Sequence, residues 1–255
     1  ANDNNFMLIS PVTHCGIGGE SEKTLVGERD VGDARYDYIT LFTDWFDYWL
    51  KGTKNTILEK PKVQLFTMGD NAWRAYDEWP INNTDFVRYY LNSKGDANSS
   101  AGTGKLQKTP PAKTSSDTFV YDPGHPVRSP YYSGAFGGFG AHDQAELELR
   151  HDVLVYSSAI LKDDVNVTGP IEVQLYVSSD AKDTDFTVKL VDVYPDGTAY
   201  NLHDSIQRAR YREGYDKSVL MEKDQIYKIT VGPLVTSNVF KKGHRIRVEI
   251  ASSRF

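Results

Sequence analysis

The chain has 255 residues, 39% of them hydrophobic and 25% charged, and a formal net charge of −6. This composition is typical of a folded protein with room for one large domain, or one domain and part of another. No Lys/Arg run predicts nucleic-acid binding, and no apolar run approaches the roughly 18 residues of a membrane helix, so neither partner is expected. Cys15 is the only cysteine, which excludes an internal disulfide. The compartment stays open, because exported bacterial proteins also often lack disulfides.

The first 60 residues predict a strand, a loop and a helix. Residues 6–9 (FMLI) read as a short buried strand that Ser10-Pro11 ends, and His14 follows on a loop. Residues 15–32 are rich in glycine and charge and predict an exposed loop. Residues 36–50 predict an amphipathic helix, with Gly52 where a C-terminal cap belongs. Its apolar positions recur at helical spacing: Ile39, Phe42, Phe46, Trp49 and Leu50.

The next segment predicts scattered strands. Residues 62–68 read as a strand, residues 69–71 as a turn, and residues 86–91 as another strand. Residues 92–117 are rich in Ser, Gly, Thr, Lys and Pro and predict a long surface loop.

From about Phe119 onward the pattern is all β, with a turn at residues 195–197 (PDG). Many short strands at regular spacing predict a two-sheet sandwich, most simply a jelly roll. Alternate side chains of a strand share one face, so one set should form the inner face. That set is Ile171, Val173, Leu175, Phe186, Val188, Leu190, Ile246, Val248 and Ile250.

His14 is the leading candidate for chemistry. A histidine on a loop after a buried strand is where an α/β-hydrolase places its general base, and in that fold the histidine follows the nucleophile and the acid along the chain. An imidazole suits this role because its unperturbed pKa lies near neutrality. Spacing alone also fits a loop histidine that is hydrogen-bonded to the main chain.

A series of motifs, in order along almost the whole chain, resembles the cocaine-esterase and X-Pro dipeptidyl-peptidase family of serine hydrolases. The first resembles the G-P-W-x-H segment that holds the family's catalytic histidine, with Ser10 for the usual Gly and Val12 for the usual Trp. The matching segments are 10–14 (SPVTH), 46–52 (FDYWLKG), 61–69 (PKVQLFTMG), 73–74 (WR), 79–80 (WP), 184–193 (TDFTVKLVDV) with 195–197, 210–213 (RYRE), 236–240 (TSNVF) and 243–246 (GHRI).

The resemblance implies a mainly β chain. Residues 1–60 would be the C-terminal end of an α/β-hydrolase catalytic domain. Residues 61–255 would be a galactose-binding-like jelly-roll domain with core strands from about 119. His14 would act as general base and then acid in cleaving an acyl ester, an α-amino-acid ester or an X-Pro peptide through an acyl-serine. No cofactor and no metal are implied.

The same resemblance indicates what is missing. The family's serine lies in a G-x-S-Y-x-G elbow well before the histidine, and its aspartate lies some tens of residues before it. Because His14 is only fourteen residues in and no G-x-S-x-G occurs, both partners are expected outside this chain. We therefore expect a chain cut at both ends, inactive alone, whose partners are the rest of the hydrolase domain and a second copy paired through an open strand edge.

The remaining candidates favour structure over chemistry. His125, His142, His151 and His203 lack metal-ligand spacing, and His244 is expected to pack near a turn. Asp183, Asp185 and Asp192 are expected at solvated or hydrogen-bonded strand ends rather than on a cation. Residues 131–139 form an aromatic, glycine-rich loop that suits either a pocket edge or packing between domains.

A different class of function stays open. The jelly roll could be a non-catalytic module that supports the hydrolase and its dimerisation, or one that binds carbohydrate. Against sugar binding, all four tryptophans (45, 49, 73 and 79) precede the β-rich region.

Overall fold

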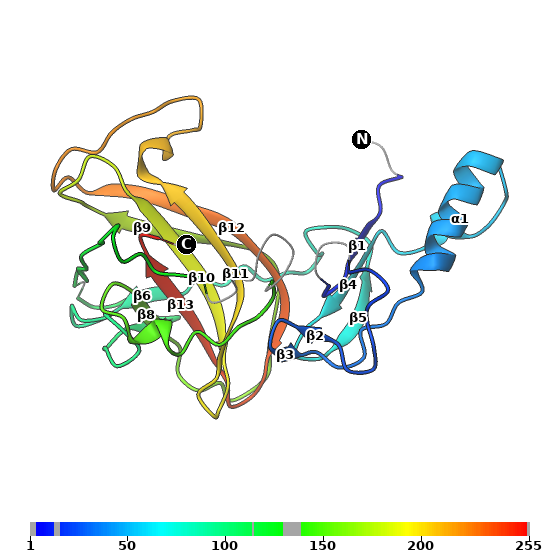
Figure 1. The fold of residues 1–255 in the computed structure, drawn as a ribbon, viewed down its shortest axis with the longest axis horizontal. Coiled ribbons are helices and arrows are strands. Elements are labelled where there is room, and N and C mark those ends of the chain that lie inside the picture. The colour runs from blue at the N-terminus through cyan, green and yellow to red at the C-terminus, as the bar shows by residue number, and fades with distance from the viewer. Residues whose placement is uncertain (1–3, 13–15, 114, 130–138, 254–255) are drawn as a thin grey trace.

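A computed structural model of the chain describes residues 4–12, 16–113, 115–129 and 139–253. The described chain is mainly β, and no helix in it is both long and apolar enough to span a membrane. Two parts are visible in Figure 1: a β sandwich and, beside it, a smaller unit that carries the long helix α1.

The sandwich is built from a six-stranded sheet and a long two-stranded ribbon. The strand order of the larger sheet is β11-β10-β13-β8-β7-β6. Its strands are β6 (Tyr90–Asn92), β7 (Lys105–Gln107), β8 (Leu154–Ser157), β10 (Asp185–Val193), β11 (Ala199–Arg208) and β13 (Arg245–Ala251). The ribbon pairs β9 (Val165–Val177) antiparallel with β12 (Tyr227–Phe240). Short 3₁₀ turns, η2 (Leu147–Leu149) and η3 (Ala209–Tyr211), lie in the connections.

One apolar layer joins the two sheets. Phe240, Ile229 and Leu234 of β12 pack in the same buried cluster as Val188 of β10 and Ile250 of β13. All nine residues predicted for the inner face belong to this cluster or pack against it. The two-layer arrangement and its inner face are therefore confirmed.

The large sheet begins earlier in the chain than the sequence predicted. β6 and β7 precede Phe119 and extend the sheet beyond β8, and Leu106 and Ala97 are buried. The expected start of the core strands at about 119 is therefore wrong, as is the long surface loop at 92–117. The strand predicted at residues 86–91 overlaps β6, but the three residues of β7 are too short to show periodicity, so only pairing with β6 and β8 reveals that strand.

The smaller unit has a β-α-β arrangement. β1 (Met7–Ile9) lies parallel to β4 (Val63–Thr67), and β5 (Ala72–Tyr76) pairs antiparallel with β4. Between β1 and β4 come the elements β2 (Leu25–Val26), β3 (Arg29–Asp30), α1 (Tyr38–Lys51) and the 3₁₀ turn η1 (Ile57–Glu59). β2 and β3 form a small hairpin.

Helix α1 confirms the predicted helix and its cap. Asp37 accepts a hydrogen bond from the Thr40 main-chain N–H at 3.0 Å, and Gly52 ends the helix with a φ of 68°. The apolar face, however, is not buried in this chain: Ile39 is 81% exposed and Leu50 77%. Figure 1 shows the reason: α1 projects away from the sandwich and from the strands of the smaller unit.

The hairpin of β4 and β5 is docked on the sandwich through its main chain. The Met68 N–H donates to the Ser237 carbonyl at 3.0 Å, and the Met68 carbonyl accepts from the Val239 N–H at 2.8 Å. Met68, the residue after β4, therefore forms a β-bridge with β12. Gly69 follows with a φ of 83°, and a Cβ at this position would overlap the Val239 carbonyl oxygen. Two constraints therefore require glycine at position 69.

Replacing Phe240 with alanine should lower the free energy of unfolding by about 3–5 kcal/mol, because its fully buried ring fills the layer between the sheets. The control is Tyr176→Ala on β9, where a 74% exposed ring should change it by no more than about 0.5 kcal/mol. Urea denaturation measures both, and equal losses would contradict the assigned core.

Gly69→Ala should destabilise the chain more than Gly52→Ala. Both glycines have positive φ, so each substitution should cost about 1–2 kcal/mol of backbone strain. Only Gly69 also abuts the main chain of β12, whereas a Cβ on Gly52 meets no atom within 4 Å. An excess loss of roughly 2 kcal/mol or more is expected at Gly69 in the same unfolding measurement. Equal losses would argue against close docking of the hairpin.

Candidate functional site

His14, the predicted base, lies outside the described residues, so its role stays a prediction. The described chain ends the first strand at Ile9, continues to residue 12 and resumes at Gly16. What the structure does place are the groups on either side of the histidine loop, defined here as residues 10–24.

A tyrosine and a glutamate hold part of the histidine loop on the start of α1. The buried Tyr38 hydroxyl donates to Glu20 Oε1 at 2.5 Å, and Glu20 Oε2 accepts from the Gly18 N–H at 2.8 Å. Burial and the adjacent Glu20 carboxylate raise the pKa of Tyr38 to about 12. The hydroxyl therefore keeps its proton at neutral pH and acts as a donor.

Three of the other histidines contact protein groups through their rings. His125 contacts Asp122 at 2.9 Å, His142 contacts Glu28 at 3.2 Å, and His203 accepts from the Val235 N–H at 2.6 Å. Within the part of the chain that the structure describes, no three His, Cys, Asp or Glu side chains are grouped as a metal site requires. Of the aromatic loop at 131–139, all but Phe139 falls outside the described residues.

Asp192 lies near the end of β10 and is hydrogen-bonded, which is one of the two environments predicted for it. Its carboxylate is completely buried and contacts three side chains. Asp192 Oδ1 lies 2.8 Å from His244 Nδ1, while Oδ2 accepts from Arg29 Nη2 at 3.3 Å and Asn238 Nδ2 at 3.2 Å. The signal was present in the sequence: Asp192 has the same parity as Phe186, Val188 and Leu190, and so lies on the inner face. Arg29 carried no such signal.

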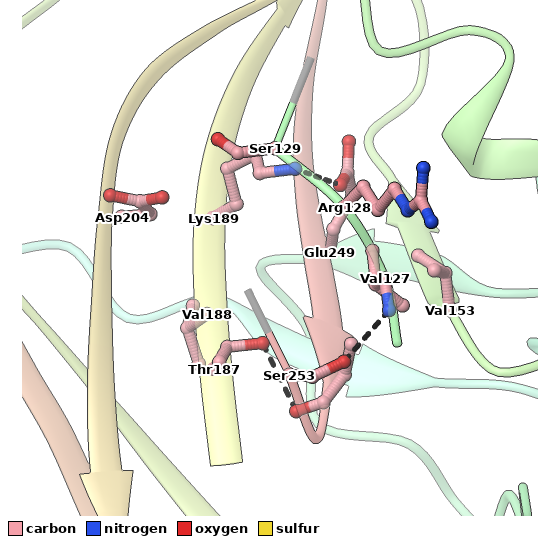
Figure 2. Close-up of a pocket in the computed structure, with 11 residues that line it drawn as sticks. Val127, Arg128, Ser129, Val153, Thr187, Val188, Lys189, Asp204, Glu249 and Ser253 are labelled. Atoms are coloured by element: carbon pink, nitrogen blue, oxygen red, sulfur yellow. Dashed lines mark hydrogen bonds and ion pairs between the residues drawn. The ribbon is translucent and has the colours of Figure 1, made fainter. Parts of the chain in front are cut away.

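A second ionic cluster lies on the opposite face of the large sheet, beside a small cavity (Figure 2). Lys189 donates to Glu249 at 3.0 Å and to Gln144 at 2.6 Å, and Arg247 donates to Glu148. The cavity is about 20 Å³, room for a single water molecule, and Val127, Ser129 and Ser253 also line it. Each cation contacts one carboxyl group of the protein here, which favours a structural role for the cluster. Sequence reasoning missed it, because its members are 99 and 60 residues apart.

Burial has a clear electrostatic effect on Glu148. Loss of water, together with the nearby Glu249 carboxylate, raises its pKa to about 7 even though Arg247 opposes the shift. The folded chain therefore binds this proton more tightly than the unfolded chain does, and stability must fall as pH rises through this range.

A shallow hollow of about 510 Å³ lies beside Phe119 and Val120. Its main polar groups already pair with protein: Arg150 binds the Asp152 carboxylate through two hydrogen bonds, and Asn98 donates to the Thr118 and His151 carbonyls. The hollow therefore offers few free donors for a sugar.

Comparison with known sequences identifies related proteins. The chain is 39% identical over 278 aligned residues to the cocaine esterase of Rhodococcus sp. (strain MB1 Bresler), covering 97% of this chain and 48% of the relative. It is 29% identical to a putative serine esterase of Mycobacterium bovis, covering 98% and 40%, respectively. The chain thus spans about half the length of these relatives, or less.

Solved structures share the fold. An aminopeptidase from a marine sediment Thaumarchaeota archaeon superposes with a TM-score of 0.83 at 28% identity, covering 98% of this chain and 42% of that one. An α-amino acid ester hydrolase gives a TM-score of 0.79 at 24% identity, with 98% and 43% coverage. A CocE/NonD family hydrolase from Staphylococcus aureus gives a TM-score of 0.62 at 14% identity, with 87% and 39% coverage, so the chain shares its fold with part of such hydrolases.

Residues 55–255 match the model of the X-Pro dipeptidyl-peptidase C-terminal non-catalytic domain, and the chain belongs to this family. The resemblance inferred from the motifs is confirmed. Because the matched domain is the non-catalytic one, the clusters at Asp192 and Glu148 are consistent with structural roles.

Replacing Glu148 with glutamine should flatten the dependence of stability on pH. Between pH 5 and 8 the wild-type chain should lose on the order of 1–3 kcal/mol as Glu148 is forced to ionise while buried. Glutamine at position 148 does not titrate between pH 5 and 8, so the variant should not lose this stability. The measurement is the free energy of unfolding at several pH values.

Glu213→Gln is the control, because Lys217 lowers the pKa of that exposed carboxyl and keeps it ionised throughout this range. A wild-type slope that survives in Glu148→Gln would show that another group titrates.

Proposed function

We propose that this chain is the C-terminal portion of a serine hydrolase that cleaves ester or amide bonds through an acyl-enzyme, with His14 as its general base and then acid. The observation that carries the proposal is the ordered set of family motifs, which runs from the histidine segment at 10–14 to residues 243–246. The names of the relatives agree in reaction class, since they include a cocaine esterase and a putative Xaa-Pro dipeptidyl-peptidase.

The arrangement of the first part of the chain supports the proposed division into domains. A strand, a helix and a parallel strand are the repeating unit of an α/β sheet, and β1, α1 and β4 have this order. We assign residues 1–60 to the end of the hydrolase domain and residues 61–255 to the C-terminal domain. The hairpin of β4 and β5 then connects the two domains. β4 pairs with β1 on one side, and Met68 at its end bonds to the main chain of β12.

The exposed face of α1 supports the rest of the hydrolase domain as a partner. A helix with a continuous apolar stripe normally buries it, and an exposed apolar patch marks an interaction site. The stripe comprises Ile39, Phe42, Phe46, Trp49 and Leu50, all exposed in this chain. If the remaining hydrolase sheet covers this stripe in the longer protein, the exposure of these five apolar residues in the present chain is explained.

The finer description of the sandwich is also a proposal. Two packed sheets with non-sequential neighbours, such as β10-β13-β8, suit a galactose-binding-like jelly roll. β9 lies at the edge of its two-stranded sheet, and a long edge strand favours pairing with another chain, so we include self-association through β9.

The alternative is a purely structural or sugar-binding module. The non-catalytic family description favours the structural role for this chain taken alone. Sugar binding has less support, because the tryptophans lie outside the sandwich strands and the hollow at Phe119 uses its polar groups internally. A glycan-binding assay on the chain separates the two.

The 255-residue chain should not hydrolyse p-nitrophenyl esters, whereas a longer protein that adds the upstream sequence should. In that longer protein His14→Ala should lower kcat by roughly 10⁴-fold or more, because the serine loses its base. His125→Ala, which alters an exposed histidine of the C-terminal domain, is the control and should keep wild-type activity. Labelling of the short chain by a fluorophosphonate, or wild-type kcat/KM in His14→Ala, would contradict the proposal.

A further inference from the structure

Both ends of the histidine loop are tied to the sandwich. On one side the loop follows β1, whose partner β4 runs into Met68 and the main chain of β12. On the other side it enters the β2–β3 hairpin, where Glu28 donates its N–H to the Ala141 carbonyl at 2.8 Å and the Ala141 N–H donates to Val26 at 3.1 Å. The described residues before and after His14 are therefore both connected to segments that contact the sandwich.

A buried ion pair completes the second contact. Arg29, on β3, reaches across to Asp192 on β10 and also donates Nε to the Tyr194 hydroxyl at 3.0 Å. The Arg29 side chain is 2% exposed and that of Asp192 is not exposed at all. His244 lies on the other side of the carboxylate and packs against the Tyr194 ring, with ring centres 4.3 Å apart.

This burial makes the link rigid. Both charges have lost their water, so neither side chain can leave the other without stranding an unpaired charge in the interior. The pair of Arg208 and Asp185 on the same sandwich is more accessible, with side chains 48% and 21% exposed, so water can replace either partner. Among the described ion pairs of residues 16–34, the pair of Arg29 and Asp192 is the one in which both side chains are buried.

We propose that Arg29 and Asp192 are positioning residues: through their buried pair, the sandwich sets the placement of residues 16–34, the described segment that follows His14 in the chain. This rests on the proposed function, in which His14 is the base. It gives the non-catalytic domain a role in turnover, since a displacement of about 1 Å at a catalytic group can cost roughly 100-fold in rate.

The test uses the longer hydrolase that contains this chain, with Asp192→Asn and Arg29→Met made singly and together. We expect kcat to fall about tenfold to 100-fold with KM within about twofold, because the loop shifts while substrate contacts elsewhere remain. The double variant should lose no more than the worse single variant, because both remove one link. Arg29→Lys, which keeps the charge, should recover part of the loss.

Glu249→Gln is the matched control. It breaks another largely buried pair of the same large sheet, formed with Lys189, whose side chain is 12% exposed and that of Glu249 4%. This pair makes no contact with residues 16–34 among the hydrogen bonds and ion pairs described. Wild-type kcat in this variant, beside the loss in Asp192→Asn, supports positioning. An equal loss in Glu249→Gln, or unchanged kcat in Asp192→Asn, overturns it.

A milder variant covers the case in which Asp192→Asn does not fold. Glu28 is exposed, accepts from the Asp143 N–H at 3.0 Å and pairs with His142, so Glu28→Ala loosens the same contact without a buried charge. Glu28→Ala should also lower kcat, by a few-fold. An unchanged kcat in this variant would overturn the proposal.

Hydrogen exchange on the 255-residue chain separates failure of this inference from failure of the proposed function. Amides of residues 16–34 should exchange at least about tenfold faster in Asp192→Asn than in Glu249→Gln, whatever reaction the longer protein catalyses. If His14→Ala is fully active, the proposed function fails while the exchange result still decides the link. Unchanged exchange in Asp192→Asn refutes the link itself.

Discussion

The buried carboxylate of Asp192 is the constraint on which the arrangement of this chain depends. It accepts hydrogen bonds from side chains 163, 52 and 46 residues away in the sequence: Arg29, His244 and Asn238. Removing one partner of a buried ion pair typically costs about 3–5 kcal/mol, because the remaining charge cannot be hydrated. The N-terminal hairpin, β12 and the turn before β13 must therefore come together around β10.

The sandwich isolates its two ionic clusters from each other. Along β10, even-numbered side chains face the ribbon and end in Asp192, whereas Lys189 faces the other way and meets Glu249 across the β10–β13 pair. Each buried charge has a partner on a neighbouring strand or segment, which is how a β-rich domain can bury charges on both faces of one sheet. The apolar layer supplies most of the stabilisation, and the clusters fix which segments meet.

The functional division follows from the same geometry. The domain that matches the family is non-catalytic, and the candidate base belongs to the segment that precedes it. That segment has little core of its own: Val31 and Ala34 are buried against Phe66 of β4, while the apolar stripe of α1 faces outward. Its placement thus depends on contacts with the sandwich and, in the proposed enzyme, on the rest of the hydrolase domain.

The sequence by itself determined the features that repeat locally. The alternation of Phe186, Val188 and Leu190 identified the inner face, and helical spacing with Gly52 identified α1, because pleat and helix periods are properties of the backbone. The ordered motifs identified the family. Tertiary structure alone decided that β6 and β7 join the sheet, that Arg29 meets Asp192, and that Glu148 and Glu249 are buried together. The three residues of β7 are too few to show a period, and the sheet position of β6 does not follow from its own residues. Side chains that pair across 60 or more residues leave no pattern in the local sequence, so these contacts form only when the sheets pack.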